Sequence, residues 1–324
     1  MDTKAHILEL FESNRGQYIS GEYIADKIGV TRNAIWKAVK ELEKDGYKIN
    51  ALTKRGYRFC ESNDILSSQG IGARLLLLTK KAYINVHKSL KSTNETAKEL
   101  AVSGADHGTI IIADHQTAGR GRYNRSFFSP PGCGIYMSFI LRPSQCSLPS
   151  SAYTTYTAVS VCEAIEEMTD AMPQIKWVND IFIDGKKVCG ILTEAVTDFE
   201  SGCIQWIVVG IGINFTTSDT EFPEEIRHIA GSIFLDKRPN ITRNTLAAGI
   251  INRILNLEND YDSELTLSKY KNRLMMLGKK VTVTGLKEVF EAIVIDIDDE
   301  ARLIVRKDNG EITSLFTGEV SIKI

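Results

Sequence analysis

Strand-like and helical segments in the middle of the chain do not alternate one for one. Apolar or alternating runs of strand length occur at residues 82–86, 109–113, 134–141, 180–183, 188–193 and 204–213. Helical spacing is confined to residues 93–102, 150–169 and 242–257. A doubly wound Rossmann sheet needs a helix between successive parallel strands. The pattern therefore predicts an α+β fold, with helices lying on a mixed central sheet.

The N-terminal segment predicts a helix-turn-helix. After a first helix at residues 5–13, Ser20 can cap a second helix that Gly29 ends, and Thr31 can cap a third helix running to about residue 44. Two helices joined by a short glycine-containing turn are typical of this motif. Two short strands, at 48–50 and 56–59, would then form a wing around the basic tip Lys54-Arg55.

Helical spacing divides the third helix into an apolar face and a basic face. Ile35, Ala38, Val39 and Leu42 fall together and should face the core. The opposite face combines a tryptophan with several bases, which suits a recognition helix that contacts DNA phosphates and base edges. We expect the DNA contacts to come from Thr31, Arg32, Asn33, Trp36, Lys37, Lys40, Lys54 and Arg55. A small helical protein-interaction domain is the alternative.

Charge and composition limit the remaining classes. Residues 1–60 carry 11 Lys and Arg against 8 Asp and Glu, although the formal net charge of the chain is −2. No apolar run approaches the roughly 18 residues of a membrane span, and the start does not have the pattern of a signal peptide. The six cysteines, at 60, 133, 146, 162, 189 and 203, form no Cys-x-x-Cys pair. We therefore expect reduced thiols, no protein metal site and a cytoplasmic location.

The C-terminal segment is short and rich in strand signals. Residues 281–284 alternate between apolar and polar, and apolar runs follow at 292–297 and 303–305. Asn309-Gly310 between strands is a strong hairpin signal. A small barrel of about five strands is expected from this spacing.

Four polar clusters lie beside the apolar strands of the middle segment. They are Ser92-Thr93-Asn94, Gln116 with Gly-Arg-Gly-Arg at 119–122, Lys-Trp-Val-Asn-Asp at 176–180 leading into Lys187 and Gly190, and Gly-Ile-Gly-Ile-Asn at 210–214. Taken singly, each has an ordinary structural explanation: a helix cap, a surface loop, a hairpin with a basic turn, or a tight strand end. Glycine permits close approach of a ligand and arginine binds anions. Neither a P-loop nor a dinucleotide fingerprint is present, which disfavours kinases, NTPases and dinucleotide enzymes.

In this order, the four clusters resemble the biotin–protein ligases. With a helix-turn-helix before them and a small barrel after them, the whole chain resembles the bifunctional bacterial form, which also represses biotin synthesis genes. The resemblance implies a winged helix-turn-helix at residues 1–62, a catalytic domain at 63–272 similar in fold to class II aminoacyl-tRNA synthetases, and an SH3-like barrel at 273–324.

The activity implied by this resemblance is that of a biotin–[acetyl-CoA-carboxylase] ligase. Biotin and ATP would give biotinyl-5′-adenylate, whose biotinyl group is then transferred to a lysine of a biotin carboxyl carrier protein domain. Because a carboxylate must attack a phosphate, a cation at the reacting centre lowers the barrier. The resemblance assigns catalysis to Lys187, Arg120 and Arg122, with Asp180 as a candidate base, and Mg²⁺ should accompany ATP.

The resemblance also divides the pocket between its two substrates. Biotin would be bound by Ser92, Thr93, Asn94, Gln116, Arg120, Gly121, Arg122, Lys187 and Gly190. ATP and the adenylate would be bound by Arg122, Arg125, Phe127, Asn179, Lys187 and Asn214. The chain departs from the family pattern at Phe127, where tryptophan is frequent, at Tyr123-Asn124, where Arg-Gly is frequent, and at Val178, where proline is common.

The partners expected from the resemblance are the carrier domain, operator DNA and a second copy of the chain in a ligand-promoted homodimer, with no membrane contact. Two other functions stay open. A lipoate–protein ligase shares the catalytic fold, and a biotin-sensing transcription factor would need no turnover. The helix-turn-helix and the Gly-Arg-Gly-Arg loop argue against the first. The complete set of charged residues argues against the second.

Overall fold

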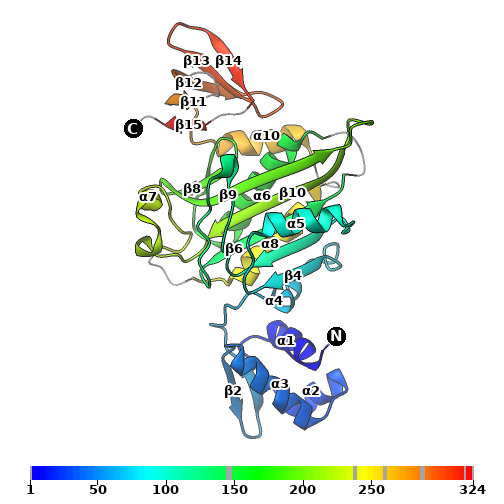
Figure 1. Ribbon diagram of the computed structural model, residues 1–324. Helices are drawn as coiled ribbons and strands as arrows, with labels where there is room; N and C mark the ends of the chain where they lie inside the picture. The colour runs from blue at the N-terminus through cyan, green and yellow to red at the C-terminus, as the bar shows by residue number, and fades with distance from the viewer. Residues whose placement is uncertain are drawn as a thin grey trace.

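The computed structural model describes residues 2–143, 148–235, 239–257, 261–284, 289–316 and 319–322. An N-terminal group of helices with a small sheet, a large central sheet with helices, and a C-terminal group of strands follow one another along the molecule (Figure 1). This arrangement confirms the α+β class expected from the sequence.

The N-terminal part consists of three helices and a three-stranded sheet. The helices are α1 (Thr3–Ser13), α2 (Gly21–Ile28) and α3 (Arg32–Lys44), in agreement with the expected order. Ser20 accepts a hydrogen bond from the backbone N–H of Tyr23, and Gly29 ends α2 in the left-handed conformation. The strands β2 (Ile49–Leu52) and β3 (Gly56–Phe59) form the predicted wing. A further strand, β1 (Tyr18–Ile19), pairs with β3 and was not predicted, because two residues show no periodicity.

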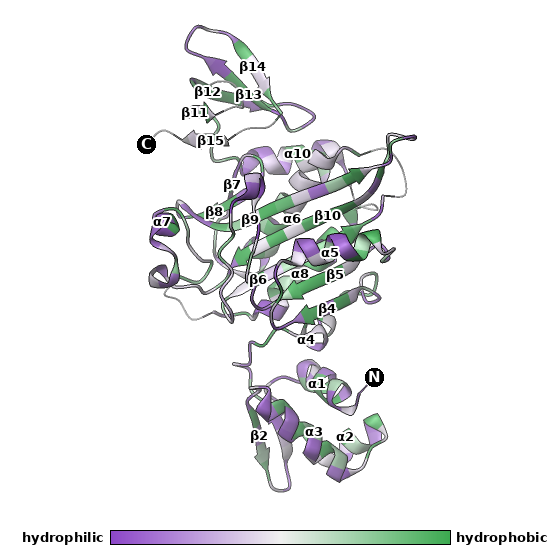
Figure 2. Cartoon of the chain, in the orientation of Figure 1, coloured by the Kyte–Doolittle hydropathy of each residue, from purple (hydrophilic) through white to green (hydrophobic). Residues whose placement is uncertain are grey.

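The two faces predicted for α3 are confirmed. Ile35, Ala38, Val39 and Leu42 are buried in a core shared with α1, α2 and Phe59. Trp36 is 52% exposed on the other side of the helix. Thr31 caps α3 by accepting a hydrogen bond from the N–H of Ala34. Figure 2 shows the polar residues along α3 and the apolar strands of the central sheet.

The central sheet is mixed, as the irregular alternation predicted. Its seven strands lie in the order β4-β5-β6-β10-β9-β8-β7, and only β4 and β5 are parallel to each other among these neighbours. In chain order they are β4 (Tyr83–His87), β5 (Thr109–Ala113), β6 (Gly134–Leu141), β7 (Gln174–Lys176), β8 (Asp180–Ile183), β9 (Lys186–Thr197) and β10 (Ile204–Asn214).

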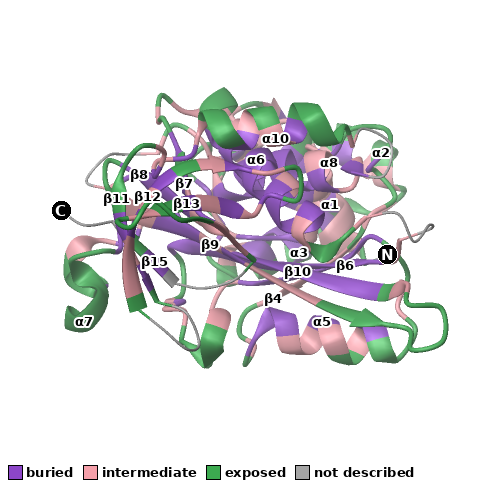
Figure 3. Cartoon of the chain, turned by 90° about the horizontal axis from the view of Figure 1, so that it is seen from above, coloured by how far each residue is buried: buried purple, intermediate pink, exposed green. Residues whose placement is uncertain are grey.

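Helices cover both faces of this sheet. On one face, α6 (Ser150–Met168) packs against the strands and is flanked by α8 (Arg243–Ile254) and α10 (Ser263–Asn272). The other face carries α5 (Thr93–Val102) beside β5, β6 and β10. Figure 3 shows the buried sheet beneath the outer, exposed side of α10. Two short helices, α4 (Ser68–Gly72) and α7 (Glu224–Arg227), complete the described helices of this part together with short 3-10 turns.

The C-terminal part is a five-stranded antiparallel sheet in the order β14-β13-β12-β11-β15. Its strands are β11 (Lys280–Thr284), β12 (Val289–Ile297), β13 (Leu303–Lys307), β14 (Ile312–Leu315) and β15 (Glu319–Ile322). The hairpin predicted at Asn309-Gly310 joins β13 to β14. The buried residues of this sheet belong to the same apolar cluster as those of the central sheet, so the two parts share a continuous core.

The segment between the helix-turn-helix and the central sheet is held by the start of α8. The Arg243 guanidinium is buried and donates to Asp64 and to Asp114 Oδ1, the latter at 2.6 Å. Asn244 accepts from the N–H of Ser67 and donates to the carbonyl of Ile65. Glu12 of α1 also pairs with Arg74, which follows α4, at 3.1 Å. The helix-turn-helix is therefore joined to the central part by polar contacts as well as by the chain.

The cysteines agree only partly with expectation. Cys60, Cys133, Cys162 and Cys189 are free thiols. Cys203 is disulfide-bonded, so the expectation of reduced thiols is wrong at this position. Cys146 lies outside the described residues. In the part of the chain that the structure describes, no helix has both the length and the apolar character needed to cross a bilayer.

Candidate functional site

The predicted site residues meet in one pocket between the 119–127 loop, the start of α5 and the ends of β8, β9 and β10. Its volume is about 300 Å³. The thirteen residues expected to bind biotin or ATP and the candidate base Asp180 all line it, namely Ser92, Thr93, Asn94, Gln116, Arg120, Gly121, Arg122, Arg125, Phe127, Asn179, Asp180, Lys187, Gly190 and Asn214. Segments more than 100 residues apart in sequence therefore form a single polar cavity against the sheet.

The 119–127 loop folds as a small hairpin. The N–H of Phe127 donates to the Gly119 carbonyl at 2.9 Å, and the N–H of Gly121 donates to the Arg125 carbonyl at 2.8 Å. The turn between them places Tyr123 and Asn124 at φ 55° and 58°, in the left-handed region. Asparagine tolerates this region better than tyrosine. The Asn124 departure from the family pattern is therefore compatible with the turn, whereas Tyr123 costs conformational energy.

Arg122 connects this hairpin to the 176–180 segment. Its Nη1 donates to Asn179 Oδ1 at 3.0 Å, and its guanidinium lies 5.0 Å from the centre of the Tyr123 ring. Asn179 in turn donates from Nδ2 to the Ile191 carbonyl of β9 at 2.7 Å. The hydrogen bond to Asn179 therefore holds the Arg122 guanidinium at this side of the pocket.

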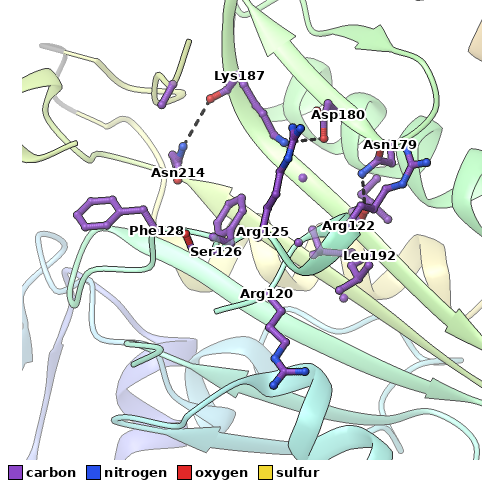
Figure 4. A pocket seen from close by; sticks show the side chains of 18 of the residues that line it. Arg120, Arg122, Arg125, Ser126, Phe128, Asn179, Asp180, Lys187, Leu192 and Asn214 are labelled. Carbon is purple, nitrogen blue, oxygen red and sulfur yellow. Dashed lines mark hydrogen bonds and ion pairs between the residues drawn. The ribbon is translucent and has the colours of Figure 1, made fainter. Parts of the chain in front are cut away.

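Lys187 and Asp180 form an ion pair across neighbouring strands. Lys187 Nζ lies 2.7 Å from Asp180 Oδ1, and the two side chains are 29% and 24% exposed. The positive charge of Lys187 is therefore held inside the pocket, only partly screened by water. Figure 4 shows Lys187, Asp180, Asn179 and Arg122 on the same side of the pocket.

Arg120 lies elsewhere in the pocket. Its guanidinium is directed away from Lys187 and Asp180 (Figure 4) and pairs with Glu95 Oε1 of α5 at 2.6 Å. Lys91 pairs with the same carboxylate group at 3.3 Å. Glu95 was not singled out in the sequence, although it follows the Ser92-Thr93-Asn94 cluster directly.

The Phe127 ring, which was expected to contact the nucleotide, lies against two glycines. The Phe127 ring approaches β9 and β10 so closely that a Cβ at Gly212 would lie 2.5 Å from the ring, and one at Gly190 3.3 Å from it. Asn214 donates from Nδ2 to the Gly231 carbonyl at 3.0 Å. Its Oδ1 is buried without a hydrogen-bond partner among the described residues. A buried acceptor of this kind suits a ligand N–H, because leaving it unpaired costs about 1–3 kcal/mol.

The segment that carries Asn179 and Asp180 is held from behind by the C-terminal third of the chain. Trp177 is buried, and its indole N–H donates to the Ala301 carbonyl between β12 and β13 at 2.8 Å. The hydroxyl of Tyr270 on α10 donates to the Val178 carbonyl at 3.0 Å. Complete burial raises the pKa of Tyr270 well above its usual value, so the hydroxyl keeps its proton. These two contacts were not predicted, because they join residues about 90 and 120 positions apart.

The described residues in and around the pocket offer neither a reactive thiol nor a cluster of metal ligands. Burial raises the pKa of Cys189 well above its usual value, so this thiol next to Gly190 stays protonated and is a poor nucleophile. Among the described residues, no group of three or more His, Cys, Asp or Glu side chains could hold a metal ion. Asp180 is the only carboxylate among the described lining residues.

Comparison with known protein families and proteins agrees with this architecture. Residues 86–214 match the biotin/lipoate A/B protein ligase family, residues 3–58 match an HTH domain, and residues 276–323 match the biotin protein ligase C-terminal domain. The bifunctional ligase/repressor BirA of Bacillus subtilis is 35% identical over 323 residues, covering 98% of this chain and 97% of that protein. The Escherichia coli protein of the same name is 27% identical over 313 residues, covering 95% and 94%.

A solved structure shares most of this fold. The biotin protein ligase of Aquifex aeolicus in complex with biotin and ATP superimposes with a TM-score of 0.63 at 28% identity, covering 74% of this chain and 98% of that one. The fold and the charged pocket define a class of proteins, namely protein ligases that carry a DNA-binding domain. The chain belongs to the family of bifunctional biotin ligase/repressor proteins.

Proposed function

We propose that the chain is an ATP-dependent biotin–protein ligase that also represses transcription of biotin synthesis genes. The observation that carries the proposal is the pocket in which Lys187, Asp180, Arg122 and Asn179 are joined pairwise by ion pair and hydrogen bond. Family membership and the helix-turn-helix support both halves of the function.

In the first step, a carboxylate oxygen of biotin forms a bond to the α-phosphorus of ATP. The bond from that phosphorus to the bridging oxygen breaks, and pyrophosphate leaves. The reactants are both anions, so Lys187 offsets their repulsion and stabilises the charge that develops on the α-phosphate. Arg122, oriented by Asn179, binds phosphate oxygens. Arg120 also binds a ligand anion, once its guanidinium has left Glu95. The ordered loop then excludes water from the adenylate.

In the second step, the amine of a carrier-domain lysine attacks the acyl carbon of biotinyl-adenylate. The bond to the AMP oxygen breaks and AMP leaves, while the nitrogen loses a proton. Asp180 is placed to accept this proton, because it lies at the reacting end of the pocket beside Lys187.

The two substrates occupy different ends of the pocket. Biotin lies along Ser92, Thr93, Asn94, Gln116, Arg120, Gly121, Arg122 and Gly190, with its carboxylate near Lys187. The nucleotide lies against Arg125, Phe127, Asn179 and Asn214, where the Phe127 face stacks on the base and Asn214 Oδ1 accepts a base N–H. Asp180 and the phosphates of ATP would together hold the Mg²⁺ that accompanies ATP, since one carboxylate plus substrate phosphates is a usual magnesium environment. The ion would screen the phosphate charge.

For the repressor half, α3 enters the major groove of operator DNA with Arg32, Asn33, Trp36, Lys37 and Lys40 directed outwards, while Lys54 and Arg55 of the wing contact the backbone. Thr31 lies at the N-terminus of α3, where its N–H can donate to a phosphate. Biotinyl-adenylate promotes a homodimer that binds paired half-sites, and the carrier domain competes for the monomer. These reactions take place in the cytoplasm.

We also propose the bounds and the folds of three domains. The helix-turn-helix comprises residues 1–62, the catalytic domain residues 63–272 with a fold similar to class II aminoacyl-tRNA synthetases, and an SH3-like barrel residues 273–324. The separate apolar core around α1 to α3 and the family matches support these boundaries.

The test is transfer of biotin by the purified chain to a biotin carboxyl carrier domain, with ATP and magnesium. Labelling that needs both biotin and ATP supports the ligase, and its loss in Lys187→Ala assigns the reaction to this pocket. No labelling and no adenylate would refute the enzyme. Operator binding in a gel-shift assay with and without both substrates tests the repressor.

A further inference from the structure

A buried hydrogen-bond network lies directly behind the end of the pocket formed by Thr93 and Asn94. Ser138 of β6 is fully buried, and its Oγ lies 2.6 Å from Asn94 Oδ1 and 2.8 Å from Thr93 Oγ1. Asn94 Nδ2 donates to Glu194 Oε2 of β9 at 3.0 Å and to the Leu192 carbonyl at 3.3 Å. Ser138 and Glu194 are not among the described lining residues of the pocket. Both therefore act on a ligand only through the residues in front of them.

The network fixes the orientation of the Asn94 amide. The Glu194 carboxylate and the Leu192 carbonyl only accept hydrogen bonds, so the NH₂ group of Asn94 faces them. Its Oδ1 then faces Ser138 and cannot donate, so the single hydroxyl hydrogen of Ser138 is directed to it. Lys98 Nζ lies 2.8 Å from Glu194 Oε1 and holds the carboxylate in place.

The hydroxyl hydrogen of Thr93 is also held inside the protein. Two acceptors are within reach of Thr93 Oγ1, namely Ser138 Oγ at 2.8 Å and Gln116 Oε1 at 3.2 Å. In either arrangement, a ligand meets the oxygen lone pairs of Thr93 and not its hydrogen. Successive donations along such a chain strengthen one another. The carboxylate of Glu194 is the acceptor at its end.

The backbone makes room for this arrangement at Gly210 of β10. A Cβ at Gly210 would lie 2.0 Å from Asn94 Oδ1, closer than any side chain allows. The absence of a side chain lets the Asn94 carbonyl reach Ser138 over the surface of the sheet. Gly210 belongs to the Gly-Ile-Gly-Ile-Asn motif, so part of this motif serves the opposite end of the pocket from Asn214.

We propose that Ser138 and Glu194 are positioning residues that set this end of the pocket to accept hydrogen bonds and so select a ligand ring with N–H donors. The inference rests on the proposed function and adds the chemical basis of its substrate choice. The ureido ring of biotin carries an N–H on each nitrogen, whereas the dithiolane ring of lipoate carries none. Ser138 and Glu194 therefore favour the binding of biotin over that of lipoate, although neither residue contacts the ligand.

The test measures adenylate formation by the full chain as a function of biotin concentration, with lipoate as a competitor. In Glu194→Gln and in Ser138→Ala, the KM for biotin rises about tenfold, the loss expected for one misdirected hydrogen bond. The kcat at saturating biotin and the inhibition constant of lipoate change less than about twofold. Glu99→Gln is the matched control, because Glu99 is an exposed carboxylate on α5 outside this network. It leaves all three quantities unchanged.

An unchanged KM for biotin in Glu194→Gln overturns the inference, and so does an equal weakening of biotin and lipoate or a loss confined to kcat. Thermal unfolding monitors the fold of each variant. If Ser138→Ala does not fold, Glu194→Gln decides, since its side chain is 35% exposed and tolerates the change. A wild-type chain that forms no adenylate at any biotin concentration overturns the proposed function instead, and calorimetric titration with biotin then still compares the variants.

Discussion

The Trp177–Ala301 hydrogen bond gives a sharp prediction about how the C-terminal sheet supports the catalytic pocket. Phenylalanine at position 177 keeps an aromatic ring and removes the indole N–H. The Ala301 carbonyl is then buried without its partner, because Trp177 and Ala301 are each only 5% exposed. An unpaired buried acceptor costs about 1–3 kcal/mol, and the smaller ring adds about 1 kcal/mol of lost packing. Trp177→Phe should therefore destabilise the chain by about 2–4 kcal/mol.

A substitution at Ala301 provides a control in which the stability of the chain should not fall. Ala301 has φ 59°, in the left-handed region, where a side chain costs about 1–2 kcal/mol. Ala301→Gly keeps the carbonyl acceptor and relieves this cost, so it should leave the stability equal to or slightly above that of the wild type.

Urea unfolding followed by circular dichroism measures both variants, and single-turnover adenylate formation measures the consequence for the pocket. Trp177→Phe should lower the urea midpoint and slow adenylate formation, because Trp177 precedes Asn179 and Asp180. Ala301→Gly should do neither. The reasoning is refuted if Trp177→Phe unfolds at the wild-type midpoint and reacts at the wild-type rate, or if the two variants behave alike.

Four further changes have expected outcomes. Lys187→Ala removes the cation at the reacting centre and should slow adenylate formation about 10²–10³-fold in quenched-flow assays; a loss below tenfold would argue against its role. Lys37→Ala should weaken operator binding and reduce its salt dependence by about one unit of slope, with adenylate formation unchanged; impaired ligation would contradict the division between the two ends of the chain. Gly210→Ala forces Asn94 away from Ser138 and should raise the KM for biotin more than it lowers kcat, and the opposite pattern in steady-state kinetics would count against it. Partial burial alone would raise the pKa of Asp298, but hydrogen bonds from the backbone and guanidinium of Arg302 lower it. Its stabilising contribution is therefore present above the unfolded-state pKa and is lost as the pH falls through the lower folded-state pKa. Asp298→Asn should destabilise the chain at pH 7 and have a smaller effect in acid, as thermal unfolding at both pH values would show.

The parts of the fold that the sequence predicted are those in which burial imposes a long, regular pattern. β5, β6 and β8 are largely apolar runs, and α5 has helical spacing, so their predicted bounds are confirmed. The helix cap that the sequence offered at the start of α5 is not formed, because the side chain of the N-cap residue Ser92 makes no cap hydrogen bond. β1 and β7 have two and three residues and are too short to show a period. α10 was missed because its mostly polar surface has little apolar periodicity.

The candidate site was predictable for the residues that lie in motifs, and less so for those that hold the motifs in place. Arg243, Glu194 and Tyr270 find partners about 90 to 180 positions away, and no local pattern encodes such distances. Ser138 was not singled out either, although a serine in the middle of the apolar run at residues 134–141 is a local signal of a buried polar contact. The disulfide at Cys203 also had no local signal, since no cysteine pair is close in sequence.

The most direct measurement of the central claim is the reaction of the purified chain with biotin and radiolabelled ATP in the absence of any carrier domain. The arrangement of Lys187, Arg122, Asn179 and Asp180 predicts about one equivalent of biotinyl-adenylate per chain, retained on the protein and matched by released pyrophosphate. No adenylate, or formation of lipoyl-adenylate in preference when both acids are supplied, would contradict it.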